Sequence, residues 1–275
     1  MARLVVVPTP IGNLEDITLR ALSELRSASL VLAEDTRHTR KLLTHFGIRK
    51  PLLSYHEHNR RSRLPRVLEA LQTGDVALVS DAGTPGISDP GTELIAAAVR
   101  EGVEVDVLPG PSAVITAVVL AAFGQSGFLF MGFLPRRAGE RREVLERVAS
   151  VPYPLVFYEA PHRLVQTLTA LREQLGNRRA VVARELSKVH QEVLRGSLDE
   201  VLERYSSEPA RGELTIVVGP EEDKSPDLSG EAFAEMRRRR AAGEERRTAV
   251  GAVSAKFGIG RNAAYRMWLE AGPGG

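Results

Sequence analysis

The chain has 275 residues, of which 43% are hydrophobic and 26% charged, so its composition is that of an ordinary globular protein. It contains no cysteine, which excludes disulfide scaffolds, thiolate nucleophiles and cysteine-ligated metal centres. No apolar run approaches the roughly 20 residues of a membrane span or the core of a signal peptide, so we expect a soluble, cytoplasmic protein.

Short β-branched runs alternate with segments of helical periodicity along most of the chain. A first set of buried strands is predicted at residues 4–7, 30–33, 52–54, 76–80 and 103–108, with helices such as 14–27 and 90–101 between them. A second set is predicted at residues 128–133, 155–158, 180–183, 192–195 and 213–218. This alternation predicts an α/β fold with two parallel-type α/β lobes, residues 1–124 and 125–222.

Residues 223–275 carry no strand signal, and their apolar spacing predicts a small C-terminal helical domain of two or three helices. Residues 257–262 have the glycine pattern of a helix-turn-helix turn, which would indicate nucleic-acid binding, but a simple packing appendage is the favoured interpretation of the segment. The role of the arginine run at residues 237–240 stays open.

Positive charge is concentrated in one segment. Residues 36–66 contain nine Lys or Arg and a single acidic residue, Glu57, whereas residues 223–275 carry a net +3 and the remainder of the chain a net −9. Solvated helix faces normally mix both signs of charge, so this segment favours a surface that faces a polyanion. The candidate substrate-binding residues are Arg37, Arg40, Lys41, Arg60, Arg61 and Arg63.

Proline- and glycine-rich loops follow three strands of the first set, at residues 8–13, 81–91 and 109–113. Ligands bind at the carboxyl ends of the strands in an open parallel sheet. Prolines hold such loops rigid, and glycines let a ligand approach the backbone closely. Three loops of this kind on one rim predict a preformed pocket.

Familiar catalytic motifs are missing from the sequence. There is no G-x-G-x-x-G after the first strand, no phosphate-binding loop of the G-x-x-x-x-G-K-[ST] type, no His-Glu-x-x-His and no Gly-x-Ser-x-Gly. Dinucleotide enzymes and hydrolases are therefore disfavoured. His56 and His58 lack a third ligand in the sequence, so no metal site is expected.

Seven ordered blocks carry a resemblance to a known family. They read VPTPIGN at 7–13, AEDTRH at 33–38, VSDAGTPGISDPG at 79–91, LPGPSA at 108–113, GFLP at 132–135, FYEAPHR at 157–163 and AREL at 183–186. In order and spacing they resemble a family of ribosomal RNA small subunit methyltransferases within the tetrapyrrole methylase (class III) superfamily.

The resemblance implies S-adenosylmethionine bound in a cleft between two α/β lobes, a homodimer, and methylation of the 2'-hydroxyl of a cytidine in small-subunit ribosomal RNA. The methyl group of a sulfonium is already activated, so the reaction is expected to require no metal. Carried over residue by residue, the cofactor-binding positions would be Pro10, Ile11, Asp81, Gly83, Thr84, Ile87, Ser112, Ala113, Tyr158, Ala183, Glu213 and Leu214.

A ribose hydroxyl is a weak nucleophile at neutral pH, so a positioned base would accelerate the reaction by about 10²- to 10⁴-fold. The catalytic candidates are Glu185, Lys188, Arg184, His38 and Asp81. Glu185 and Lys188 would share a face if their segment turned helically, and a surface ion pair is the plain alternative. Glu34, Asp35 and Glu159 are further carboxylates near the expected cleft, but the first two could cap a helix and Glu159 could pair with Arg163.

Two other functions remain open. A methyltransferase acting on a tetrapyrrole would share the cofactor site but would not need nine basic residues in one segment. A non-catalytic RNA-binding protein would leave the three rim loops without a purpose.

Overall fold

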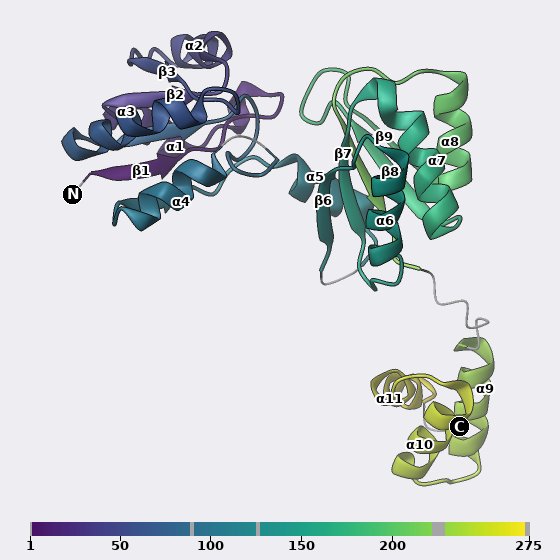
Figure 1. The fold of residues 1–275 in the computed structure, drawn as a ribbon. Coiled ribbons are helices and arrows are strands. Elements are labelled where there is room, and N and C mark those ends of the chain that lie inside the picture. The colour runs from purple at the N-terminus through teal and green to yellow at the C-terminus, as the bar shows by residue number, and fades with distance from the viewer. Residues whose placement is uncertain (1, 89–90, 125–126, 222–228, 273–275) are drawn as a thin grey trace. The chain divides into compact units, whose positions relative to one another are not determined.

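The computed structural model describes residues 2–88, 91–124, 127–221 and 229–272 (Figure 1). The chain divides into two compact units, Met1–Glu221 and Glu222–Gly275, and the first unit contains two five-stranded sheets. The α/β fold class is confirmed. The lobe and tail boundaries expected near residues 124–125 and 222–223 adjoin residues 125–126 and 222–228, which lie outside the described residues. No helix in the described part of the chain is long and apolar enough to cross a membrane.

The first sheet is entirely parallel, with the strand order β3-β2-β4-β1-β5. Its strands are β1 (Arg3–Val6), β2 (Leu30–Ala33), β3 (Leu52–Ser54), β4 (Val76–Val79) and β5 (Glu104–Val107). Each lies within a residue of its predicted position. The apolar runs of β1, β2 and β4 are continuous because helices cover both faces of the sheet, whereas the edge strand β5 alternates acidic and apolar residues.

Four helices cover the two faces of the first sheet: α1 (Leu19–Ser27), α2 (Thr36–His45), α3 (Arg60–Thr73) and α4 (Thr92–Arg100). Apolar side chains of α1 and α2 pack in one core cluster, and those of α3 and α4 in another. The helix predicted at 14–27 is divided into a short 3-10 turn, η1 (Leu14–Asp16), and α1. The division falls at Thr18, whose side chain accepts a hydrogen bond from the Ala21 amide and caps α1. Pro90, where the next helix was expected to begin, lies outside the described residues.

Strands β4, β1 and β5 are neighbours in the first sheet. The three proline- and glycine-rich loops follow these strands, so the parallel arrangement brings all three to one edge. This is the rim that the sequence predicts.

The second sheet has the order β6-β7-β10-β8-β9 and is mixed. Its strands are β6 (Leu129–Phe133), β7 (Leu155–Glu159), β8 (Arg179–Arg184), β9 (Glu192–Ser197) and β10 (Leu214–Val218). Only β6 and β7 are parallel, and the other three pairings are antiparallel. The expectation of a parallel second lobe is therefore wrong. Residues 185–191, which join β8 to β9, are too few for the crossover that a parallel pair needs.

Helices α6 (Ala138–Val148), α7 (Leu164–Leu175) and α8 (Leu198–Ser207) contribute to one core cluster with the second sheet, and α7 is preceded by a short turn, η2 (Pro161–Arg163). Helix α5 (Ala113–Ala121) packs on the other face. Its sequence, AVITAVVLA, carries no charge. Val114, Ala117 and Ala121 of α5 are buried with Val156, Val181 and Val217 of the sheet and with Ile11 of the first rim loop. The first lobe's last helix is thus part of the second lobe's core.

The C-terminal unit contains α9 (Ser229–Ala241), α10 (Arg246–Phe257) and α11 (Arg261–Glu270). They enclose a small core that includes the fully buried Met236 and Val253. Gly258 ends α10 in the left-handed conformation, and α11 follows after Gly260. Three residues of the arginine run make contacts within the unit. Arg238 and Arg239 form ion pairs with Glu235. Arg240 donates a hydrogen bond to the Trp268 carbonyl, and its guanidinium group lies 4.9 Å from the centroid of the Trp268 ring. These contacts give most of the run a packing role.

Candidate functional site

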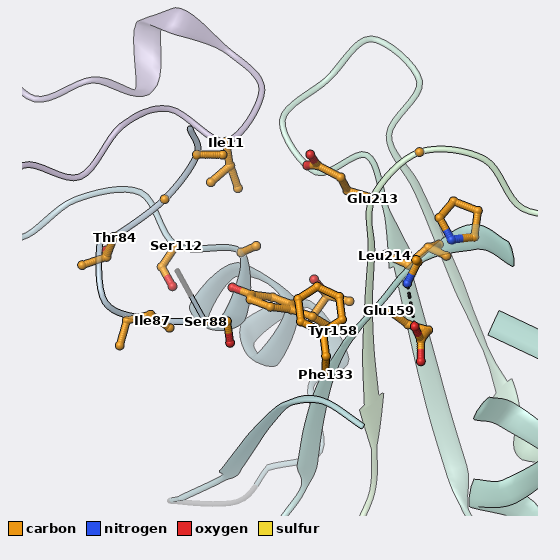
Figure 2. A pocket seen from close by; sticks show the side chains of 17 residues that line it. Ile11, Thr84, Ile87, Ser88, Ser112, Phe133, Tyr158, Glu159, Glu213 and Leu214 are labelled. Carbon is orange, nitrogen blue, oxygen red and sulfur yellow. Dashed lines mark hydrogen bonds between the residues drawn. The ribbon is translucent and has the colours of Figure 1, made fainter. Parts of the chain in front are cut away.

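A pocket of about 310 Å³ opens at the rim that the three loops form (Figure 2). The first lobe contributes Ile11, Ala82, Gly83, Thr84, Ile87, Ser88, Ser112 and Ala113. The second lobe contributes Phe133, Tyr158, Glu159, Ala160, Pro161, Gly212, Glu213, Leu214 and Thr215. The volume lies in the range of small-molecule sites. We call it the rim pocket.

The first-lobe wall is held by main-chain bonds between two of the loops. The Thr9 amide donates to the Gly83 carbonyl and the Gly83 amide to the Thr9 carbonyl, both at 2.9 Å, and the Thr9 hydroxyl donates to the Ser80 carbonyl at 3.1 Å. Gly83 has a φ of +75°, which disfavours any other residue. Ser112 caps α5 by accepting from the Ile115 amide. The pocket therefore meets the positive end of the α5 dipole.

Aromatic rings form part of the second-lobe wall. The Tyr158 ring packs edge-on against Phe130, with centroids 5.0 Å apart, and tilts against Phe133 at 5.7 Å. Phe133 stays 53% exposed. The wall thus offers an apolar surface on which a flat ligand group can lie.

Glu159 is the buried carboxylate of this wall, and its hydrogen bonds are made inside the protein. It accepts from the Ala160 amide at 2.8 Å and from the Thr167 hydroxyl at 2.5 Å, and Arg163 lies 3.4 Å away. The pairing with Arg163 considered from the sequence is confirmed. Glu159 shapes the wall, and its oxygens are committed to these partners.

The Glu185 carboxylate supports the opposite edge of the pocket without lining it. It accepts from the Glu213 amide and from the Lys188 ammonium, each at 2.8 Å, while Lys188 also reaches the Glu213 carboxylate at 3.1 Å. A Cβ on Gly212 would come within 2.4 Å of the Glu185 carboxyl group, so these two segments fit together only because residue 212 is glycine. The helical turn considered for this segment does not form, since Glu185 and Ser187 have φ of 51° and 62°.

The charges of this pair are mutually stabilised. The hydrogen bond from Lys188 holds the pKa of Glu185 below its usual value. Burial alone would lower the pKa of Lys188, but its hydrogen bonds to Glu185 and Glu213 leave it raised. A carboxylate with a lowered pKa is a weaker proton acceptor, so the pair is better suited to holding Gly212 and Glu213 in place.

A second hollow of about 230 Å³ lies beside the rim pocket, and we call it the α2 hollow. Thr9, Pro10, Leu14, His38, Lys41, Leu42, His45 and Asp81 line it. The loops at 9–11 and 81–83 contribute residues to both the α2 hollow and the rim pocket, and the Thr9–Gly83 bridge joins these two loops. His38, Lys41 and His45 are spaced to share one face of α2.

Carboxylates gather behind this hollow at the ends of β2 and β4. Asp81 accepts a hydrogen bond from the Asp35 amide at 3.1 Å, and Asp35 caps α2 through the Arg37 amide. Burial, together with the negative charge of Asp81, raises the pKa of Glu34. The capping role considered for Asp35 from the sequence is confirmed.

Nine of the twelve positions expected at the cofactor line the rim pocket: Ile11, Gly83, Thr84, Ile87, Ser112, Ala113, Tyr158, Glu213 and Leu214. Pro10 and Asp81 line the α2 hollow with the catalytic candidate His38, and Ala183 is buried in the core beside α5. Arg184 faces a third hollow and pairs with Glu192 at 2.8 Å. The sequence therefore predicts one composite site that the structure divides among adjoining hollows.

Among the remaining lining residues, Glu159 was considered from the sequence as a carboxylate near the cleft. The others were not singled out: Ala82, Ser88, Phe133, Ala160, Pro161, Gly212 and Thr215. Most of them lie inside the blocks that carry the family resemblance. Gly212 directly precedes the strand predicted at residues 213–218, and this position was the one available signal for it.

The six candidate substrate-binding residues lie on α2 and α3. Arg37 pairs with Asp35 and is 85% exposed, and Arg60 pairs with Glu93. Arg40, Lys41 and Arg61 are exposed and Arg63 is half-buried, and none of these four has an ion-pair partner among the described residues. Nowhere among the residues that the structure describes do three His, Asp or Glu side chains gather as metal ligands would.

Replacing Glu185 with Gln should lower the free energy of unfolding at pH 7 by about 1–3 kcal/mol, because Lys188 loses the nearer of its two carboxylate partners. A carboxylate with a lowered folded-state pKa stabilises fully above its ordinary pKa of 4.5 and loses that contribution as the pH falls through the folded value. The difference in Tm between variant and wild type, measured by calorimetry, should therefore shrink between pH 7 and pH 3.

Glu143→Gln is the control, because Glu143 is exposed on α6 and forms no ion pair within the described residues. The Glu143→Gln variant should have nearly the same Tm as wild type at both pH 7 and pH 3. If Glu185→Gln lowered Tm by the same amount at pH 7 and pH 3, the charge-based explanation would be contradicted.

Comparison with known proteins places this geometry in a family. Residues 3–202 match the model of the Tetrapyrrole (Corrin/Porphyrin) Methylases. A Thermotoga maritima protein named ribosomal RNA small subunit methyltransferase I is 47% identical over 223 residues, which cover 81% of this chain and all of that protein. A Synechocystis protein of the same name is 42% identical and covers 98% of both chains.

Solved structures show the same fold at lower identity. The methyltransferase CobJ aligns with a TM-score of 0.60 and 20% identity, covering 80% of this chain and 95% of its own. Uroporphyrin-III C-methyl transferase from Thermus thermophilus, complexed with S-adenyl homocysteine, aligns with a TM-score of 0.58 and 22% identity, covering 79% and 97%. This chain belongs to the tetrapyrrole methylase family and, within it, to the ribosomal RNA small subunit methyltransferase I group.

Proposed function

We propose that this chain transfers a methyl group from S-adenosylmethionine to the 2'-hydroxyl of a cytidine in small-subunit ribosomal RNA. The names of its relatives support the reaction class and the RNA. The observation that carries the proposal is the rim pocket, which adjoins a hollow lined by the basic helix α2. A tetrapyrrole substrate is less well supported, because its few carboxylates do not require this much positive charge.

The residues of the rim pocket fit S-adenosylmethionine. Gly83 leaves its side open, since even an added Cβ would meet only Ile11 at 3.7 Å and Pro111 at 3.9 Å. We infer that Gly83, Thr84 and Ser112 hold the amino-acid end and that Tyr158 and Leu214 enclose the adenine. When bound, the cofactor supplies a methyl group already activated for transfer, so the protein mainly has to align the nucleophile and exclude water.

We infer that the target nucleotide enters the α2 hollow and that Asp81 or His38 takes the proton of its ribose hydroxyl. Both line this hollow beside the rim pocket, and Lys41 on the same helix supplies positive charge for a phosphate. Glu185 and Lys188 act as positioning residues through Glu213. Arg184 does not line either cavity.

We also infer a homodimer working in the cytoplasm, where ribosomal subunits are found. Val107 on the edge strand β5 and Ile115 and Val119 on α5 are more than half exposed, which gives an apolar face suited to a second copy. The mass in solution, measured by light scattering, tests the dimer.

Gly83→Val should reduce the affinity for S-adenosylmethionine by more than about 100-fold, because the side chain occupies space that the cofactor needs. Gly86→Val is the matched control: Gly86 lies in the same loop with a φ of +86°, so the strain is similar, but it does not line the rim pocket. Calorimetric titration measures both. Equal losses in the two variants would show that loop strain, and not a filled pocket, is responsible.

Asp81→Asn and His38→Ala test the base. The variant of the true base should lower the single-turnover rate of methyl transfer to small-subunit RNA by about 10²- to 10⁴-fold while the affinity for the cofactor is kept. Asp16→Asn, an exposed carboxylate of η1 outside both cavities, is the control. Radiolabelled methyl transfer followed by mass-spectrometric mapping measures rate and position together. Label that enters a tetrapyrrole but not RNA would refute the proposed substrate.

Replacing Arg60, Arg61 and Arg63 with Ala should weaken RNA binding and make it less sensitive to salt. The slope of log K against log salt concentration should fall by about one for each phosphate that the protein no longer neutralises. A matched triple change at Arg136, Arg137 and Arg142, exposed residues of the second lobe, should alter the slope little. An unchanged affinity and slope in the first variant would make α3 only a solvated face.

A further inference from the structure

A third hollow, of about 420 Å³, lies at the junction of β8, β9 and α8. Its charged lining comprises Arg184, Arg204, Arg211, Glu192 and Glu208, and the uncharged residues Tyr205, Pro209 and Ala210 line the rest. Three guanidinium groups against two carboxylates give a net charge of +1. None of these residues lines the rim pocket or the α2 hollow.

The two carboxylates are already paired inside the hollow. Arg184 donates from Nε to Glu192 at 2.8 Å, and Arg204 donates from Nη1 to Glu208 at 2.5 Å. The other nitrogens of both guanidinium groups make no hydrogen bond to the described residues, and Arg211 makes no side-chain hydrogen bond or ion pair there. The hollow therefore has several unused N–H donors.

Tyr205 provides the independent observation. It is only 4% exposed, and its hydroxyl is buried without a hydrogen-bond partner in the described structure. Arg184, Glu192 and Arg204 line the same hollow as Tyr205. Burial and the charge of Glu192 raise the pKa of Tyr205, whereas Arg184 and Arg204 act in the opposite direction. A buried hydroxyl without a partner is costly, and a ligand oxygen would satisfy it.

We propose that this hollow binds a phosphate group through Arg184, Arg204, Arg211 and the Tyr205 hydroxyl. The groups without partners are donors, and a phosphate offers several acceptor oxygens to a set of arginines. A net charge of +1 matches the single negative charge of a phosphodiester, which favours an RNA backbone phosphate over a free phosphate.

The position of the hollow suits an RNA that reaches the proposed methylation site. Arg211 directly precedes Gly212 and Glu213 of the rim pocket, and Arg184 pairs in register with Leu214. The hollow and the rim pocket thus lie on either side of the same short segment. An RNA strand held here would run past the edge of the rim pocket; the choice of RNA as the source rests on the proposed function, whereas phosphate binding itself does not.

Inorganic phosphate titrated into the full chain, with Tm and calorimetric heat as readouts, tests the site directly. Wild type should show saturable binding and a raised Tm. Arg211→Ala and Tyr205→Phe should each lower phosphate affinity at least about fivefold, and Arg211→Lys should restore part of it. Tyr205→Phe removes one oxygen and keeps the packing, and Arg137→Ala, at the exposed residue just before α6, serves as the surface control.

The second arm measures affinity for small-subunit RNA as a function of salt. If the source is RNA, Arg211→Ala should reduce the salt slope by about one and weaken binding. Abolished phosphate binding with unchanged RNA affinity would support the site and assign it to a free phosphate compound. Phosphate binding that is absent in wild type, or identical in wild type, Arg211→Ala and Tyr205→Phe, would overturn the proposal. Failure of methyl transfer with intact phosphate binding would count against the proposed function alone.

Discussion

The packing of α5 against the second sheet is the interaction on which the site depends. This uncharged helix is capped by Ser112 at the rim pocket, and one face of it, with Val114, Ala117 and Ala121, is buried against β8 and β10. Because the same cluster includes Ile11 and Leu186, it joins a rim loop of the first lobe to the loop that carries Glu185. The two walls of the rim pocket are therefore held by one apolar core, which is close-packed and resists displacement.

Polar contacts then refine what the apolar core positions. Gly12 is so close to the 186–188 segment that a Cβ there would lie 2.5 Å from the Lys188 side chain. Lys188 in turn holds Glu185 and Glu213. A chain of short contacts thus runs from the first rim loop to the edge of the second lobe, and each contact involves a glycine or a charge-assisted hydrogen bond. Such contacts suit a pocket that must be formed before its ligand arrives.

The separation of the rim pocket, the α2 hollow and the third hollow also has a simple physical origin. Parallel strands β4, β1 and β5 deliver their loops to one rim, and the Thr9–Gly83 bridge separates the rim pocket from the α2 hollow. In the second lobe, antiparallel pairing puts the end of β8 beside the beginning of β10. Arg184 and Leu214 consequently meet there, although they lie far apart in the sequence. A wholly parallel sheet would have put these two ends at opposite edges.

Local sequence patterns were enough to predict the α/β class, the positions of the strands, the rim loops and nine of the residues that line the rim pocket. These features follow from local patterns: β-branched runs, prolines and glycines after strands, and blocks shared with relatives. Other features depend on the tertiary structure: the mixed pairing of the second sheet, the burial of Ala183 and the hydrogen bonds that occupy the Glu159 carboxylate. The same is true of Pro10, Asp81 and Arg184, which line hollows other than the rim pocket. Pairing direction and side-chain partners depend on contacts between residues far apart in the chain, and no local pattern encodes which of two allowed neighbours a strand or a carboxylate will meet.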